Sequence, residues 1–217
     1  MTDAASSRVT RLRPATESRT VRTRSTNDAA RGRKHLTRDE VHRLIRAAKK
    51  GRQGQRDALM IRLAFEHGLR VSELVALKWQ HLDLASGHTL TVQRAKGSLD
   101  GTHPLQGETV RALKRYQTAT ERRDGFVFVS ERGAPVSIEG FRKMLARLSV
   151  RVLGVPWHPH ALRHACGVHL INSGTDIRTV QQYLGHANIQ NTVAYTALSG
   201  RPFERVRKPS SRRWHRP

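Results

Sequence analysis

The fold class is decided by Thr89-Leu90-Thr91-Val92-Gln93, whose alternating β-branched residues interrupt a chain of otherwise helical patterns and predict a strand. Lys96-Gly97 follows as a turn, and residues 102–105 can return as a partner strand. The apolar run Phe126-Val127-Phe128-Val129 predicts a third, buried strand. We therefore expect a small antiparallel sheet of three strands.

Helical patterns flank this sheet on both sides. Leu36 and Thr37-Arg38-Asp39-Glu40 form an apolar staple residue and a capping box, a usual beginning of a helix. Apolar residues then repeat at helical spacing as far as Gly51, which lies just beyond the expected end. Helices, a minor sheet and further helices in that order indicate an α+β fold that is mainly α. The remaining helices are expected near residues 54–67, 72–78, 108–121, 138–151, 160–173, 176–184 and 189–196.

The chain carries a large excess of positive charge. Its 217 residues include 40 Lys and Arg against 17 Asp and Glu, which gives a formal net charge of +23 and a pI near 11.7. Such charge repels itself in a compact fold, so we expect a polyanionic partner, with nucleic acid ahead of an anionic membrane. No apolar run is long enough to predict a membrane span. The single cysteine, Cys166, suits a reducing cytoplasm, so we expect a cytoplasmic, nucleoid-associated protein.

Composition divides the chain into three parts. Residues 1–33 are rich in Arg, Ser and Thr without periodic apolar positions, which predicts a disordered basic arm. Residues 34–200 hold the helical and strand patterns and are expected to form one domain. Residues 201–217 carry seven basic residues and one acidic residue, which predicts a basic tail. The arm and the tail would add affinity for a polyanion rather than specificity.

Two motifs place a cation at the beginning of a helix or at a turn. In Gly68-Leu69-Arg70-Val71-Ser72-Glu73-Leu74, Arg70 stands between a helix-ending glycine and a new helix, where a guanidinium can grip two phosphate oxygens. Glu73 can hold that guanidinium in place, although a surface ion pair between helices is the simpler explanation. Lys96, at the tip of the predicted hairpin, can reach DNA or a leaving oxygen, but taken alone it is a solvated turn residue.

A third motif is His158-Pro159-His160-Ala161-Leu162-Arg163-His164. It places His160 and Arg163 on one helical face, so an imidazole and a guanidinium can converge on one phosphate. His160 and His164 also have the i, i+4 spacing of a zinc-binding helix, but Ala161 stands where hydrolases of that kind place a glutamate. The cluster can equally belong to the surface of a basic helix.

A fourth motif is Gln181-Gln182-Tyr183-Leu184-Gly185-His186, with Tyr195 nine residues further on. Gly185 is expected to end a helix and to leave His186 at its exposed end. Tyr195 follows on a short helix, where a lone tyrosine is most often a half-buried core residue.

These residues together resemble a known constellation. The set resembles the active site of the tyrosine recombinases, the phage integrase family, in this chain order: Arg70, Lys96, His160, Arg163, His186 and Tyr195. The resemblance covers roughly residues 34–200 and implies the catalytic-domain fold of that family. Three motifs carry it, at 68–74, at 158–164 and at Leu184-Gly185-His186 ahead of Tyr195.

Within the family, the small fimbrial phase-variation recombinases are the most similar, through residues 102–105, 158–167 and 191–196. Typical integrases carry a helical core-binding domain before the catalytic domain, whereas about 33 basic residues stand there in this sequence. We therefore expect no complete two-domain clamp around DNA within one chain.

The resemblance implies a mechanism and partners. Tyr195 would attack a phosphodiester and form a 3′-phosphotyrosine, which stores the bond energy, so neither ATP nor another cofactor is expected. Cationic side chains would do the work of a metal ion, so none is expected. Arg70 and Arg163 would bind the non-bridging oxygens of the phosphate. His160 would accept the proton of the phenol, and Lys96 would protonate the departing 5′ oxygen. His186 would donate a hydrogen bond to the phosphate. The implied partners are double-stranded DNA with specific recombination sites and accessory DNA-bending proteins. Four copies of the chain would assemble as a homotetramer on two such sites, and the C-terminal tail of each copy can dock on a neighbouring copy. The outcome would be inversion or integration of a DNA segment.

Two other functions remain open. A non-catalytic DNA-binding protein of the same fold would form no covalent adduct with DNA. A metal-dependent nuclease built from the 12 histidines would lose its activity in EDTA.

Overall fold

The computed structural model describes residues 33–94 and 100–198, so Lys96, residues 1–32 of the predicted arm and the whole predicted tail lie outside the described residues. Every predicted helix is present, within a few residues of its expected bounds. The helices are α2 (Arg38–Ala48), α3 (Gly54–Glu66), α4 (Val71–Val75), α5 (Gly107–Thr120), α6 (Ile138–Leu153), α7 (Pro159–Asn172), α8 (Ile177–Leu184) and α9 (Gln190–Leu198).

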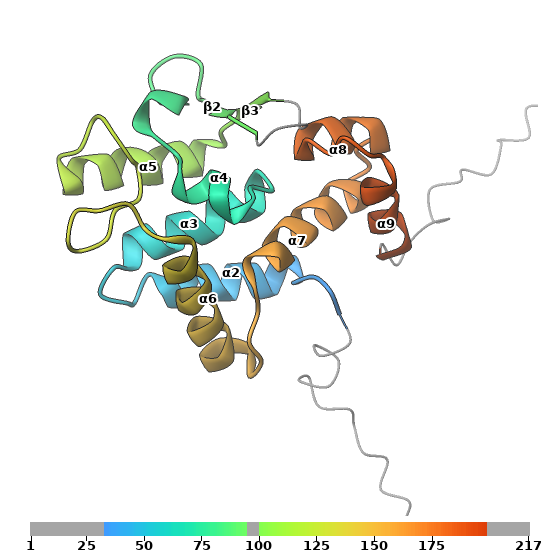
Figure 1. Ribbon diagram of the computed structural model, residues 1–217, viewed down its shortest axis with the longest axis horizontal. Coiled ribbons are helices and arrows are strands. Elements are labelled where there is room, and N and C mark those ends of the chain that lie inside the picture. The colour runs from blue at the N-terminus through green and yellow to red at the C-terminus, as the bar shows by residue number, and fades with distance from the viewer. Residues whose placement is uncertain (1–32, 95–99, 199–217) are drawn as a thin grey trace, which may run out of the picture.

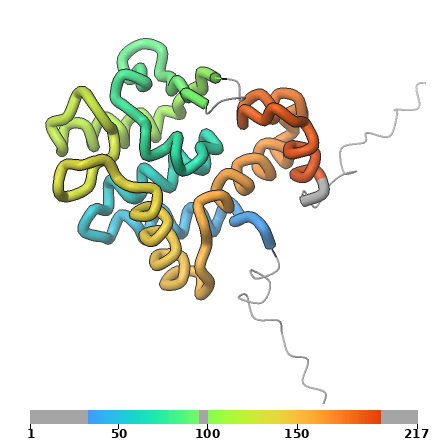
Figure 2. Tube along the Cα trace, viewed as in Figure 1, coloured from blue at the N-terminus to red at the C-terminus, as the bar shows by residue number. Residues whose placement is uncertain are grey.

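Helix α3 lies at the centre of the helical part and packs against α2, α5 and α7 (Figure 1). The chain leaves α6, crosses back beside α3 as α7, and ends in α8 and α9, at the opposite end of the molecule from α5 (Figure 2). One apolar core runs through these helices, and its fully buried members include Leu44, Leu63, Leu113, Leu145 and Leu162. No helix within residues 33–94 and 100–198 is both long and apolar enough to cross a membrane.

The first described helix begins as the sequence predicts. The backbone N–H of Thr37 donates to Glu40 Oε2 at 2.8 Å, and the backbone N–H of Glu40 donates to Thr37 Oγ1 at 3.3 Å. This reciprocal capping box satisfies two N–H groups that the helix itself cannot. Leu36, the staple residue, is buried against the core.

The sheet has three antiparallel strands in the order β1 (Leu82–Asp83), β2 (Thr89–Val92) and β3 (Gly101–Pro104). The predicted α+β, mainly α fold with a small antiparallel sheet is therefore confirmed. Leu90 pairs with Leu82 on one side and with His103 on the other, and its side chain is buried. Residues 95–99, which include Lys96, follow β2 and precede β3 in the chain and lie outside the described residues.

The prediction that Phe126-Val127-Phe128-Val129 is the third strand was wrong. This run makes only isolated bridges, between Lys78 and Phe126 and between Val129 and Pro135. Its apolar content instead serves the core, where Val127 and Phe128 are fully buried. The true third strand, β1, has two residues, which is too short for alternation along the chain to reveal it.

Gly68 turns the chain from α3 into the segment that carries Arg70. Its φ of +58° lies in the left-handed region, which glycine adopts at little cost. A Cβ at this position would also collide with the Leu184 side chain, so the turn is closely packed against α8. The sequence prediction that Gly68 ends this helix is confirmed, because α3 stops at Glu66.

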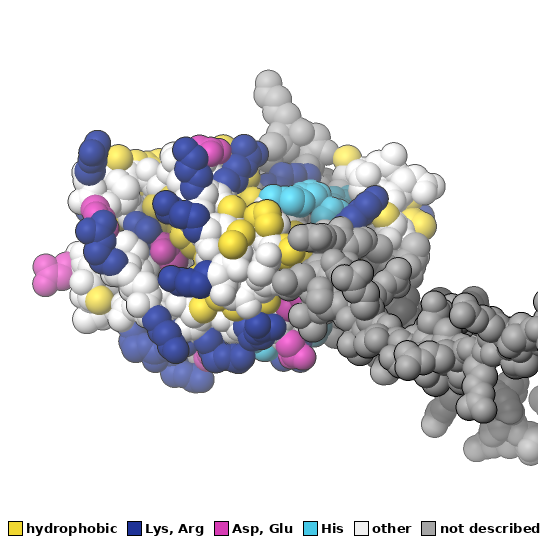
Figure 3. Space-filling view, turned by 90° about the horizontal axis from the view of Figure 1, so that it is seen from below, with side chains coloured by type: hydrophobic (Ala, Val, Ile, Leu, Met, Phe, Trp, Pro, Cys, Tyr) yellow, Lys and Arg dark blue, Asp and Glu magenta, His cyan; other side chains and the backbone are white. Residues whose placement is uncertain are grey.

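Positive charge is spread widely over the described surface. Figure 3 shows Lys and Arg side chains across most of one face, with fewer acidic side chains between them and a group of histidines in its upper right part. The basic character of the chain is therefore not confined to the residues that precede and follow the described domain.

A buried polar cluster joins β3 to α8 beneath the sheet. The ring of His103 stacks on the ring of Tyr183 with centroids 3.9 Å apart, and the Tyr183 hydroxyl donates to the Glu66 carbonyl at 2.9 Å. The hydroxyl oxygen lies 3.1 Å from Nδ1 of His67, which therefore donates to it. His67 and His103 are 1% and 2% exposed. Burial, with smaller contributions from neighbouring positive groups, lowers the pKa of His67 to about 3 and that of His103 to about 4.

This cluster makes the stability of the fold depend on pH. Both pKa values lie below the ordinary 6.5, so the unfolded chain binds more protons as the pH falls below that value. Stabilisation that is complete above pH 6.5 is then lost as the pH falls through about 4, by up to about 3 kcal/mol for each ring. Urea unfolding followed by circular dichroism between pH 7.5 and pH 4 measures this change. His103→Asn should weaken the pH dependence of the free energy of unfolding, whereas His88→Gln, at an exposed position, should leave it unchanged. A free energy of unfolding that is constant over this pH range would contradict the prediction.

Candidate active site

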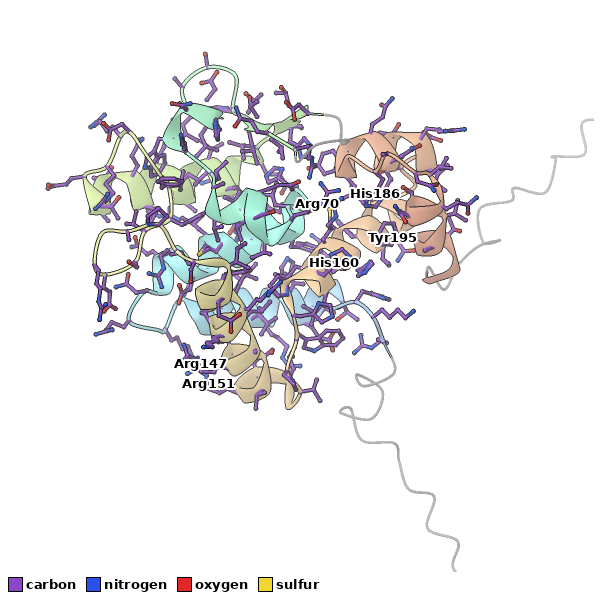
Figure 4. All side chains as sticks on the ribbon, viewed as in Figure 1. Arg70, Arg147, Arg151, His160, His186 and Tyr195 are labelled. Atoms are coloured by element: carbon purple, nitrogen blue, oxygen red, sulfur yellow. The ribbon has the colours of Figure 1, made fainter. Side chains whose placement is uncertain are left out.

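The structure describes five of the six predicted site residues and brings them to one region. Arg70 is the residue that precedes α4, and its backbone N–H donates to the side chain of Glu73 in the first turn of that helix. Figure 4 labels Arg70, His160, His186 and Tyr195, whose side chains gather between α4 and the layer formed by α7, α8 and α9. Arg163 lies one turn after His160 on α7, as the spacing predicts. Lys96, the sixth residue, lies outside the described residues.

Arg163 is a buried cation at the centre of the region. Its side chain is 1% exposed, and its guanidinium donates to the Gly68 carbonyl and, at 2.6 Å, to the Leu184 carbonyl. Gly68 lies in the turn before α4, and Leu184 is the last residue of α8, so the hydrogen bonds of Arg163 connect these two segments. Burial, followed by the charges of Arg70 and Arg94, lowers the pKa of Arg163 to about 10, so the group remains charged at neutral pH. A buried charge that only carbonyls contact is costly, and an anion at this position would offset that cost.

Arg70 shares a carboxylate with a second arginine. Glu73 accepts from the Arg70 backbone N–H and from its Nη1, both at 2.8 Å, so the predicted contact between these two residues is present. The other partner is Arg94, whose Nη1 lies 2.8 Å from Glu73 Oε2. The Arg70 side chain is 32% exposed, whereas those of Glu73 and Arg94 are 5% and 1% exposed. Arg70 is therefore the member of the trio that solvent reaches.

The sequence prediction missed Arg94 as a residue of this region. Its Nη2 donates to the Tyr183 carbonyl at 2.7 Å, and its backbone N–H donates to Asp100 Oδ1 at 2.6 Å. The signal was present, because Arg94 stands two positions before Lys96, which had already been chosen for its charge. Spacing alone gave no reason to expect that its side chain turns inward rather than to solvent.

Two histidines contact the Tyr195 ring, and a third, His160, contacts one of them. His164 contacts the Tyr195 ring edge-on at 5.4 Å between ring centroids and contacts the His160 ring at 4.2 Å. The His186 ring lies 6.0 Å from the Tyr195 ring, and its Nδ1 is 3.0 Å from Thr192 Oγ1. His164, which the sequence suggested only as half of a zinc pair, therefore stands between two predicted site residues. Among the described residues, no group of three or more His, Cys, Asp or Glu side chains is placed to hold a metal ion.

The surroundings of these imidazoles favour their neutral form. Burial, followed by the charges of Arg163 and other cations, lowers the pKa of His160, and it lowers that of His186 to about 4. His164 also has a pKa of about 4, through burial and then the neighbouring His160. A neutral imidazole can accept a proton, whereas a charged one cannot.

Tyr195 is buried rather than half-buried, since its side chain is 1% exposed. Burial raises the pKa of its phenol, and the nearby charges of Arg163 and Arg70 oppose that rise. The phenol thus lies within the electrostatic reach of both arginines. A phosphate of a DNA backbone can reach it only after α9 or its neighbours move.

One face of the Tyr195 ring rests on the backbone of α7 at Gly167. A Cβ on this glycine would lie 2.7 Å from two ring carbons and 2.9 Å from a third. Glycine within a helix costs about 1 kcal/mol relative to alanine, so its presence there signals a close approach. The sequence contained this signal, but it did not identify which side chain comes close.

Gly167→Ala is expected to force Tyr195 and α9 away from α7. Overpacking of this kind typically costs about 1–3 kcal/mol of stability, and we expect covalent capture of DNA by Tyr195 to fall at least about tenfold, since a displacement near 1 Å can cost 10²-fold. Urea unfolding and an adduct assay on denaturing gels measure the two effects. Gly107→Ala, at the first residue of α5, is the matched control, because its Cβ would meet only the end of Arg111 at 3.5 Å. Equal behaviour of the two variants would refute the close contact.

Comparisons with known proteins give consistent results. The family model described as "Phage integrase family" matches residues 34–201. The type 1 fimbriae regulatory protein FimE of Escherichia coli K12 is 37% identical over 178 residues, which is 79% of this chain and 89% of FimE. Tyrosine recombinase XerC of Bacillus pumilus is 37% identical over 156 residues, or 67% of this chain, and the match spans half of XerC. The crystal structure of XerA recombinase superposes with a TM-score of 0.67 at 31% identity, over 75% of this chain and 59% of XerA. The chain therefore belongs to the phage integrase family and is a tyrosine-type site-specific recombinase.

Proposed function

We propose that this recombinase breaks a DNA strand by attack of the Tyr195 phenol on a phosphodiester, which leaves a phosphotyrosine on the 3′ side of the break. The gathering of the Tyr195, Arg70, His160 and His186 side chains in one region is the observation that carries this proposal (Figure 4). The charges of Arg163 and Arg70 oppose the rise that burial causes in the pKa of Tyr195. The same charges favour the phenolate character that the oxygen acquires during attack.

Arg70 and Arg163 bind the non-bridging oxygens of the scissile phosphate. Arg163 uses two of its N–H groups on carbonyls and keeps others for the phosphate. Both guanidinium groups are held by the protein before the phosphate arrives, so little reorganisation accompanies the reaction. Removal of one preorganised donor from a site of this kind typically costs roughly 10²–10³-fold in rate.

Proton transfer falls to groups with suitable charge at neutral pH. His160 accepts the phenol proton because its lowered pKa keeps its ring neutral. His186 donates a hydrogen bond to the phosphate through the ring nitrogen that Thr192 does not contact. Lys96 protonates the departing 5′ oxygen. The phosphotyrosine bond keeps the energy of the broken bond, so rejoining needs no ATP, and these cations take the place of a metal ion.

Site-specific recombination acts on double-stranded DNA. We propose that four copies of this chain assemble on two recombination sites, exchange strands in pairs, and invert or integrate a DNA segment within the nucleoid. Accessory DNA-bending proteins would bring the two sites together. The resemblance of residues 102–105, 158–167 and 191–196 to the fimbrial phase-variation recombinases favours inversion. The similarity to FimE, a type 1 fimbriae regulatory protein, over 79% of this chain agrees with it.

A nicked suicide substrate tests the cleavage chemistry. A duplex that carries a candidate site and a nick near the cleavage position loses a short fragment after attack, so the covalent intermediate cannot rejoin. We expect a denaturation-resistant protein–DNA adduct through Tyr195 that also forms in EDTA. A protein that binds the duplex without any adduct would be a non-catalytic binder, and adduct-free cleavage that stops in EDTA would indicate a metal-dependent nuclease. Either result would overturn the proposal.

A further inference from the structure

The carboxylate of Glu73 lies between two arginines that differ in exposure. Arg70, at 32% exposed, occupies Oε1, while Arg94, at 1% exposed, occupies Oε2. Each contact measures 2.8 Å. Arg94 also donates to the Tyr183 carbonyl, so both terminal nitrogens of its guanidinium contact groups of the protein.

The trio of Arg70, Glu73 and Arg94 carries one net positive charge. Without Arg94, Arg70 and Glu73 would form a pair with no net charge, and the field of Arg70 at a phosphate would largely disappear. Opposite charges interact more strongly in a partly buried site than in water, so such cancellation is large there. The nearby Arg163 contacts carbonyls, so its charge is not offset in this way.

We propose that Arg94 is a positioning residue that offsets the charge of Glu73 and thereby keeps Arg70 electrostatically available to the scissile phosphate. Glu73 holds Arg70 in place, and Arg94 prevents that contact from neutralising it. The inference rests on the proposed function, because it assumes that Arg70 binds the phosphate that Tyr195 attacks.

A purely mechanical brace is the simpler role, since Arg94 links the end of β2 to α4 and α8. One detail favours the electrostatic role. Arg94 Nε is buried without a hydrogen-bond partner among the described residues, and a buried, incompletely bonded charge is a costly brace. Burial lowers the pKa of Arg94, and the neighbouring Glu73 opposes that fall, so the charge is kept.

The experiment compares two suicide substrates that differ only in the charge of the scissile phosphate. One carries the ordinary phosphodiester, and the other carries a methylphosphonate, which is neutral. The rate of adduct formation is measured for the wild type, Arg94→Gln, Arg94→Lys and Glu73→Gln/Arg94→Gln. Arg62→Gln is the matched control, because Arg62 also joins two carboxylates, Glu66 and Glu108, away from this region.

On the phosphodiester we expect Arg94→Gln to react about 10- to 100-fold more slowly than the wild type, below the roughly 10²–10³-fold typical of a donor that touches the substrate. On the methylphosphonate the deficit should shrink to about threefold or less, because a neutral phosphonate depends less on the field of Arg70. Arg94→Lys should keep most of the rate. The double variant should react faster than Arg94→Gln, since it also lacks the carboxylate that Arg94 offsets. Arg62→Gln should change neither rate.

Several results would overturn the proposal. An equal deficit of Arg94→Gln on both substrates would indicate a brace. A folded Arg94→Lys as slow as Arg94→Gln would show that charge at this position is not what matters, and this comparison holds even if the glutamine variant fails to fold. A wild type that forms no adduct on either substrate would remove the proposed function and this inference together, whereas a reactive wild type with an equal deficit removes the inference alone.

Discussion

Tyr195→Phe is expected to abolish covalent capture of DNA while the fold and DNA affinity remain. The substitution removes only the hydroxyl oxygen, and the phenyl ring keeps its place against Gly167, His164 and His186. Loss of the nucleophile in other covalent enzymes lowers the rate by more than about 10⁴-fold, so the adduct should fall below detection. Denaturing gels with the suicide substrate measure the adduct, and fluorescence anisotropy measures binding.

Tyr116→Phe is the matched control. Tyr116 lies on α5, its side chain is 5% exposed, and it takes no part in the candidate active site. This variant should form the adduct at the wild-type rate. Undiminished adduct formation by Tyr195→Phe would show that another residue is the nucleophile, and equal loss in both variants would indicate a defect in folding.

Arg163→Lys should show the second-largest effect, although it preserves the charge. A lysine has no planar fork, so it cannot contact the Gly68 and Leu184 carbonyls and still present further N–H groups to a phosphate. We expect adduct formation to slow by roughly 10²–10³-fold. A carbonyl left without its partner in a buried position should also lower the free energy of unfolding by about 1–3 kcal/mol.

Arg151→Lys provides the comparison for this variant. Arg151 is exposed on α6, well apart from the labelled site residues in Figure 4. Its replacement should leave both the adduct rate and the stability near their wild-type values. The rate of adduct formation at saturating DNA measures the effect of Arg163→Lys on the reaction, and urea unfolding curves measure its effect on stability. A rate of adduct formation within threefold of wild type would contradict the assigned role.

Much of the fold could be predicted because its signals are local. The capping box at Thr37 and Glu40, and glycines such as Gly68 and Gly185, mark helix ends through backbone chemistry that neighbouring residues determine. The run 126–129 shows the limit of such signals. Its apolar residues are needed by the core, and nothing within four residues distinguishes a buried strand from a buried extended segment that makes only isolated bridges.

The candidate site likewise contains residues that local motifs predict and residues that they do not. Arg70, His160, Arg163, His186 and Tyr195 stood out because their motifs give each residue type a chemical role. Arg94 and Gly167 act through residues far away in the chain, Glu73 in one case and Tyr195 in the other. Such partnerships depend on how α4, α7 and α9 pack, which no single segment encodes.

The packing of the Tyr195 ring against the backbone of Gly167 has a consequence for how this side chain is released. The bare backbone at Gly167 has no methyl or longer group that could interlock with this face of the ring, so no side chain at position 167 blocks the ring when it moves. The resting grip is then mainly dispersion, each atom pair contributing only about 0.1–0.2 kcal/mol. The Tyr195 ring therefore stays buried in the free protein, and we expect modest contacts made by arriving DNA to suffice to release it.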